Sequence, residues 1–152
     1  MLGRWDDSIR SNQAALKASR EYAARNFPGT TFAQEPHAQD FMAYAYLQLG
    51  QTREAKRMVE ELAAITKFSG ARNYGRDTGQ VAPAARSVLE RAAWSEAPAL
   101  EVRTNTYAYA QAIPRFVRAV GAAKVGKPET AKEEIAQLQA QRLAGPRGGP
   151  QR

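Results

Sequence analysis

The chain has 152 residues, 43% of them hydrophobic and 24% charged, with a formal net charge of +7. This length suits one compact domain or a short repeat array, and the composition is that of a folded globular protein rather than a disordered one. No apolar run approaches the about 18 residues of a membrane-spanning helix, and the absence of cysteine excludes disulfides, iron–sulfur clusters and thiol nucleophiles.

The positive charge favours acidic partners without identifying one. Lysines and arginines are scattered from Arg4 to Arg152 and often stand next to acidic residues, whereas a nucleic-acid surface concentrates its basic residues on one face. A solvated surface with a basic excess is therefore favoured over a nucleic-acid interface. The first residues lack the layout of a secretory signal, which favours a cytoplasmic location.

Alanine, which makes up about a fifth of the chain, points to an all-α fold because it has the best helix propensity and lets helices approach closely. Strand patterns are nearly absent. Periodicity and stop residues predict about seven helices, over 6–26, 36–49, 53–67, 83–92, 95–102, 108–125 and 128–143. Thr52 is the expected cap of the third helix, and Pro114 is expected to kink the sixth or to mark its true first turn.

Two stretches are expected to lack regular structure. The segment 68–80 contains three glycines and is predicted to be irregular, and the tail 145–152 is predicted to be disordered. Residues 1–144, with the irregular segment inside them, are expected to form a single helical-repeat domain.

Helix–turn–helix joints recur along the chain with one pattern. Each has an apolar residue, a glycine, two linking residues, and a small residue five positions after the glycine. The glycines are Gly3, Gly50 and Gly126, and a fourth copy has Ala92 in the glycine's place. Glycine ends a helix in a left-handed conformation at little cost. Helix pairs of this kind cannot bury their apolar faces alone, so they are expected to stack.

This pattern resembles the tetratricopeptide repeat. In the best copy, 36–67, Tyr46 and Ala43 stand at the family's tyrosine and small helix-contact positions, and Ala55 stands at its second-helix alanine. The joints lie 47, 42 and 34 residues apart (3 to 50, 50 to 92 and 92 to 126), and the last spacing is the family period. The chain is also similar to bacterial proteins of this type whose role is unassigned. The resemblance implies a superhelix of stacked helix hairpins that acts as a protein-interaction scaffold.

In this family the first helix of each pair lines a concave groove, so the resemblance nominates groove residues that bind a peptide or protein segment. They are His37, Asp40, Tyr44, Gln48, Arg86, Glu90 and Lys124, with Leu47, Leu89, Phe116 and Val120 beside them. The first four are spaced three and four apart and should form one helical stripe suited to a polar peptide or small ligand. The competing interpretation, in which Tyr44 packs in the core and the polar residues only meet solvent, is equally open.

A small-molecule enzyme or sensor using His37, Asp40 and Tyr44 is a second class of hypothesis. His37 is the only histidine, and Asp40 lies one turn away; histidine titrates near neutral pH and ligates metals. A metal site needs three or four ligands, however, and Glu35 is the only other candidate nearby in the sequence. No catalytic motif accompanies these residues, so we expect no catalytic residue, metal or cofactor.

A third class is a nucleic-acid or polyanion binder that uses the segment 68–80. Arg72, Tyr74 and Arg76 make this segment a candidate anion-contact loop, because arginine grips phosphate or carboxylate and tyrosine stacks on bases. Disorder of the loop is the favoured alternative.

The helix over 6–26 follows Gly3, which is already a joint in the middle of a repeat. The helix then lacks its own first-helix partner. Missing N-terminal repeats or a second copy in a homodimer are expected to cover its apolar face.

Overall fold

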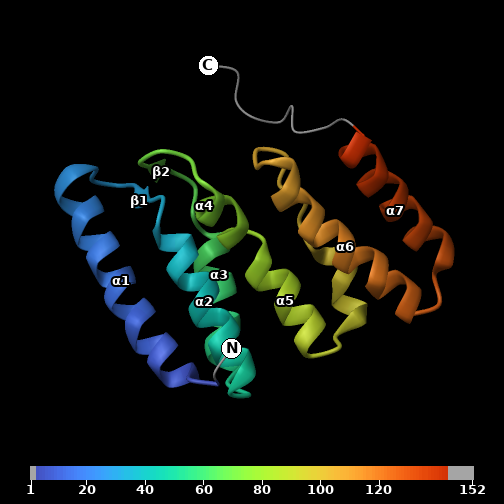
Figure 1. Cartoon of the computed structure of the whole chain (residues 1–152), viewed down its shortest axis with the longest axis horizontal. Helices are drawn as coiled ribbons and strands as arrows, with labels where there is room; N and C mark the ends of the chain where they lie inside the picture. Colours follow the sequence, from blue (N-terminus) through green and yellow to red (C-terminus); the bar gives the residue numbers. More distant parts are fainter. Residues whose placement is uncertain (1–2, 144–152) are drawn as a thin grey trace. The chain divides into compact units, whose positions relative to one another are not determined.

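The computed structural model of this protein describes residues 3–143 (Figure 1). This part of the chain contains eight helices and one pair of two-residue strands, which confirms the predicted all-α fold. The tail over 145–152 lies outside the described residues. The chain divides into two compact units, Met1–Pro83 (unit 1) and Ala84–Arg152 (unit 2). That 1–144 form a single domain stays a prediction.

Unit 1 is organised around one central helix. Its elements are α1 (Trp5–Asn26), β1 (Thr31–Phe32), α2 (Glu35–Gln48), α3 (Thr52–Ala63), β2 (Phe68–Ser69), α4 (Tyr74–Gly79) and the first residues of α5 (Ala82–Glu90). Helix α2 packs against α1, α3 and α4. The two strands pair in parallel, with Thr31 opposite Phe68. Because three helices pack around α2, most of its side chains are buried.

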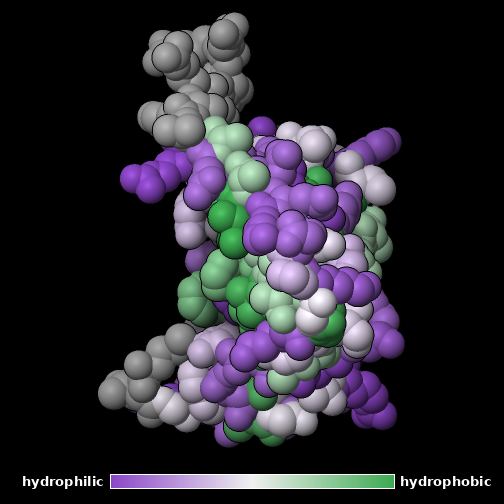
Figure 2. All heavy atoms as spheres, turned by 90° about the vertical axis from the view of Figure 1, so that its right-hand side faces the viewer, coloured by the Kyte–Doolittle hydropathy of each residue, from purple (hydrophilic) through white to green (hydrophobic). Residues whose placement is uncertain are grey.

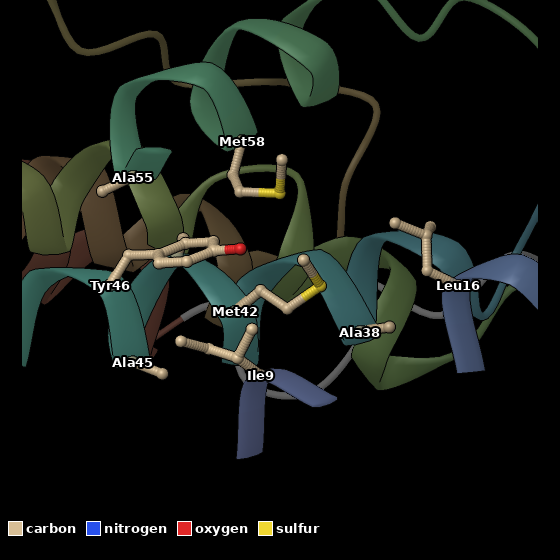
Figure 3. Packing of buried hydrophobic residues seen from close by; sticks show 9 residues of the cluster. Ile9, Leu16, Ala38, Met42, Ala45, Tyr46, Ala55 and Met58 are labelled. Atoms are coloured by element: carbon tan, nitrogen blue, oxygen red, sulfur yellow. The ribbon is translucent and has the colours of Figure 1, made fainter. Parts of the chain in front are cut away.

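The core of unit 1 lies between α1, α2 and α3. Figure 3 shows Met42 of α2 among Ile9 of α1 and Met58 of α3. Ile9 and Leu16 are two turns apart and lie on the face of α1 that packs against α2. The expectation that the helix over 6–26 lacks cover for its apolar face is therefore wrong, because α2 covers it.

Unit 2 contains the remainder of α5, a short 3₁₀ helix η1 (Trp94–Ala99), α6 (Ala108–Lys124) and α7 (Pro128–Leu143). Helix α6 packs against both η1 and α7. Its core combines Val88 of α5, Ala97 of η1 and Val117 of α6. Gly121 allows the approach of η1, because a Cβ at this position would overlap the Cβ of Ala97.

The predicted joints are confirmed by the backbone. Gly3, Gly50 and Gly126 have positive φ angles of 67°, 70° and 73°, and Ala92 is the only other-than-glycine residue with positive φ (51°) in the described chain. The residue after each of the last three joint positions donates its N–H to a carbonyl five residues earlier, which is the Schellman pattern. These hydrogen bonds are Gln51 to Tyr46 (2.8 Å), Ala93 to Val88 (2.9 Å) and Lys127 to Ala122 (2.8 Å).

The small residues that follow these joints behave as predicted. Ala55, Ala97 and Ala131 each stand five positions after the left-handed residue, and all three are buried. A larger side chain at these positions would hold the two helices of a pair apart. The joint and the close contact after it are therefore one local unit that appears in both halves of the chain.

Several boundaries differ from the prediction. Thr52 is the first residue of α3 rather than its cap, and the preceding Gln51 makes no capping bond through its side chain. Helix α3 ends at Ala63 instead of continuing to 67. The predicted helix over 95–102 is the shorter 3₁₀ helix η1. Its Pro98 has no backbone N–H with which to donate an intrahelical hydrogen bond.

Two further predictions concern Pro114 and the segment 68–80. Pro114 lies inside α6, so the alternative in which it marks the first turn is wrong, and the kink stays a prediction. The segment 68–80 is ordered, since it contains β2 and α4. Asn73 caps α4 by accepting a hydrogen bond from the Arg76 N–H at 2.9 Å. Among the described residues, no helix has the length and apolar character needed to cross a membrane.

Candidate binding surface

One side of α2 remains open to solvent and carries a row of ring-bearing side chains. His37, Phe41, Tyr44 and Gln48 follow one another at intervals of four, three and four, so they share a helical face. We call this set the α2 stripe. His37 and Gln48 are exposed, Tyr44 is half-buried, and Phe41 is 46% exposed. The stripe contains every exposed side chain of α2.

The sequence prediction placed Asp40 on this stripe, which is wrong. Asp40 is buried, and Phe41 takes its place beside His37. Spacings of three and four are both compatible with one helical face, so the pattern from His37 to Tyr44 admits either residue. Carboxylates are usually exposed, so an exposed Asp40 was the simpler expectation. The packing of other helices around α2 buries it instead.

Edge-to-face ring contacts fix three members of the stripe. The rings of His37 and Phe41 lie 4.9 Å apart at an interplanar angle of 80°. Tyr44 contacts Trp5 of α1, with centroids 5.6 Å apart and rings perpendicular. Such contacts are favourable beyond the burial of apolar area. The aromatic side chains are therefore held in place before any partner binds.

Helix α4 holds the other end of the stripe. A Cβ added to Gly75 would lie 2.9 Å from Nδ1 of His37, so the α4 backbone lies directly against the imidazole. Gly79 approaches α2 even more closely, because a Cβ there would overlap the backbone of Pro36. The sequence prediction missed both glycines as packing residues. Their spacing of four on one helix is the signal that could have found them.

The chemistry of His37 does not extend to a metal site. In the part of the chain that the structure describes, no group of three or more His, Asp or Glu side chains could hold a metal ion. His37 is exposed whereas Asp40 is buried. That a small-molecule enzyme or sensor uses His37, Asp40 and Tyr44 stays a prediction.

The candidate anion-contact loop uses its arginines internally. Nε and Nη2 of Arg72 donate to the carboxylate of Asp77 at 2.7–3.2 Å, and Asp77 is fully buried. The Arg76 guanidinium lies 4.4 Å from the centre of the Phe68 ring. Tyr74 alone is widely exposed, at 66%. Asp77 is the residue that sequence reasoning missed, although an acid five positions after an arginine is visible in the sequence.

The other predicted groove residues belong to unit 2. Arg86 is half-buried and Glu90 is exposed, both on α5. Lys124 is exposed at the end of α6, with its Nζ 6.0 Å from the centre of the Trp94 ring. Phe116 on α6 is 54% exposed. None of these residues is part of the α2 stripe.

Comparison with known proteins identifies no family for this chain. The chain matches no protein-family model, no curated protein and no solved structure.

Proposed function

We propose that this chain is a protein-interaction module in which the α2 stripe binds a segment of a partner protein. The observation that carries the proposal is Phe41, a large apolar side chain left 46% exposed on a helix whose other sides are covered. Isolated exposed hydrophobic residues are common, but Phe41 adjoins other rings on the same stripe, and apolar groups gathered in this way are typical of interaction sites. Stacked hairpins of the tetratricopeptide type are part of the same proposal, supported by the recurring joints.

The stripe has the composition of a recognition surface. Phe41 and Tyr44 supply rigid apolar area at low entropic cost, since their rings are already packed against His37 and Trp5. His37 and Gln48 add hydrogen-bonding groups at the two ends. A partner segment with an apolar anchor near its middle and polar groups on both sides matches this arrangement.

Affinity capture with two matched variants tests the proposal. Phe41→Ala removes the exposed ring of the stripe, and Phe27→Ala removes a phenylalanine of similar exposure, 40% against 46%, at the C-terminal end of α1 and outside the stripe. We expect a partner captured by the wild-type chain to be kept by Phe27→Ala and to bind Phe41→Ala at least about tenfold more weakly, the loss typical of an aromatic anchor. The dissociation constant for the captured segment should be measured by calorimetry.

Stability must be measured alongside binding. Because both phenylalanines are about half exposed, both variants should unfold within a few degrees of the wild-type chain. If both variants retain the partner with wild-type affinity, the α2 stripe is not the binding surface and the proposal is wrong.

A further inference from the structure

Two arginines of α6 share one buried carboxylate of α7. Nη1 of Arg115 lies 3.2 Å from Oε2 of Glu134, and Nη2 of Arg118 lies 2.7 Å from Oε1 of the same residue. Glu134 is 6% exposed. The two arginines are three positions apart, so they lie on the same face of α6. We call Arg115 and Arg118 the arginine pair, and Glu134 is its carboxylate.

The arginine pair carries more positive charge and more donors than its carboxylate satisfies. Across residues 3–143, Glu134 is the only hydrogen-bond or ion-pair partner of either guanidinium. Nε of Arg115 is buried and has no hydrogen-bond partner. Each guanidinium presents several N–H donors, and like charges this close on a helix repel each other. The cluster therefore has a surplus of one positive charge and several unused donors.

The surroundings of the pair increase this surplus. Helix α6 contains no acidic residue between Ala108 and Lys124. Over 84–143 the sequence has 9 Lys and Arg and 6 Asp and Glu, a net charge of 9 − 6 = +3. Figure 2 looks onto the side on which α7 lies in Figure 1 and shows hydrophilic side chains over much of that face, with hydrophobic ones between them.

The cluster at Asp77 in unit 1 differs in how its arginines meet the carboxylate. There, Arg72 donates to both oxygens of a fully buried carboxylate through Nε and Nη2, and the Arg76 guanidinium lies over the Phe68 ring. In unit 2, the closest contact of Arg115 and of Arg118 with Glu134 is made by a terminal nitrogen. Solvent access is similar in the two clusters, since the Arg72 and Arg76 side chains are 27% and 19% exposed and those of Arg115 and Arg118 are 21% and 33% exposed.

We propose that Arg115 and Arg118 bind a phosphate group, either inorganic phosphate or a phosphate monoester. The planar guanidinium fork matches the spacing of phosphate oxygens. Glu134 holds the two guanidiniums in fixed orientations from the α7 side, and the anion neutralises the remaining charge from the solvent side. Arg115 and Arg118 are binding residues in this proposal, and Glu134 is a positioning residue.

Phosphate titration of the whole chain tests the proposal. Sodium phosphate and sodium chloride are compared at pH 7.5 and equal ionic strength, with thermal unfolding and calorimetry as readouts. At ten times its dissociation constant, phosphate should lower the unfolding equilibrium constant about elevenfold. Arg118→Gln should abolish this effect, while Arg91→Gln, which removes a guanidinium from its exposed pair with Glu96, should retain it.

A second readout avoids any dependence on how the variant folds. In NMR spectra of the wild-type chain, the Nε–H signals of Arg115 and Arg118 should shift on addition of phosphate, and that of Arg72 should stay in place. A parallel titration with O-phosphoserine separates the sources: binding of both ligands assigns the site to the phosphate group itself, and binding of only one of them assigns it to that source. If neither ligand acts beyond chloride, or if Arg118→Gln binds phosphate as tightly as the wild-type chain, the proposal is overturned.

Discussion

The joints at Gly50 in unit 1 and Ala92 in unit 2 have the same backbone conformation but different residues. Both residues are left-handed, with φ angles of 70° and 51°, and both are followed by an N–H that bonds to a carbonyl five residues back. A left-handed alanine costs roughly 1–2 kcal/mol relative to its right-handed form. The comparison shows that the hydrogen bonds and the packing of the next helix impose the turn. Glycine only lowers the conformational free energy that the left-handed residue costs.

The two joints also differ in the helix that follows. After Gly50 the chain forms α3, an α-helix of 12 residues, whereas after Ala92 it forms η1, a 3₁₀ helix of 6 residues that contains Pro98. Unit 2 therefore combines the strained joint with the weaker helix. We expect unit 2 to be the less stable half around this joint.

The largest expected effect concerns the buried carboxylates of the two units. Asp77→Ala removes the fully buried carboxylate that Arg72 binds and should lower the free energy of unfolding by about 3 kcal/mol. Glu134→Ala should cost less, about 1 kcal/mol, because Glu134 is 6% exposed whereas Asp77 is 0% exposed. Denaturant unfolding measures both. Equal losses would show that the two clusters are buried to the same degree.

An intermediate effect is expected at the two glycines that allow close approach. Gly79→Ala and Gly121→Ala should each destabilise the chain by about 1–3 kcal/mol, because the added Cβ overlaps a neighbouring element. The obstacle is the Pro36 backbone in unit 1 and the Ala97 methyl group in unit 2. The double variant Gly121→Ala with Ala97→Gly should therefore recover part of the loss. Thermal melts of the single and double variants check this, and an absence of recovery would place the clash on the backbone of η1.

The smallest effect is expected from exchanging the joint residues. Gly50→Ala should destabilise the chain by about 1 kcal/mol, since its Cβ meets open space and only the positive φ opposes it. Ala92→Gly should stabilise it by about 0.5 kcal/mol, because relief of strain exceeds the entropy lost on ordering glycine. Chemical denaturation of both variants is the measurement. A destabilised Ala92→Gly variant would mean that the joint is not strained.

The local features of the fold were largely predictable. Helix ends and joints depend on a few neighbouring residues, so Gly50, Gly126 and even the alanine substitute at position 92 were recognised correctly. The segment 68–80 was not, because its order depends on distant contacts. Phe68 pairs with Thr31, and α4 packs against α2 through Gly75 and Gly79.

The candidate surface was predicted in part. His37, Tyr44 and Gln48 lie on the open side of α2, as their spacing indicated, but Asp40 is buried and Phe41 is exposed. The two residues are adjacent, and either fits a helical spacing. Hydrophobicity alone would have assigned them the opposite positions.

From its amino-acid order alone, this chain was bound to form alanine-rich helices joined by left-handed turns, because propensity and capping act over a few residues. Which side of α2 stays open, and which arginines pair with Glu134, depended on how α1, α4 and α7 pack against their neighbours. Burial is a property of the assembled units, so residues such as Asp40, Asp77 and Glu134 acquire their roles only when distant segments meet.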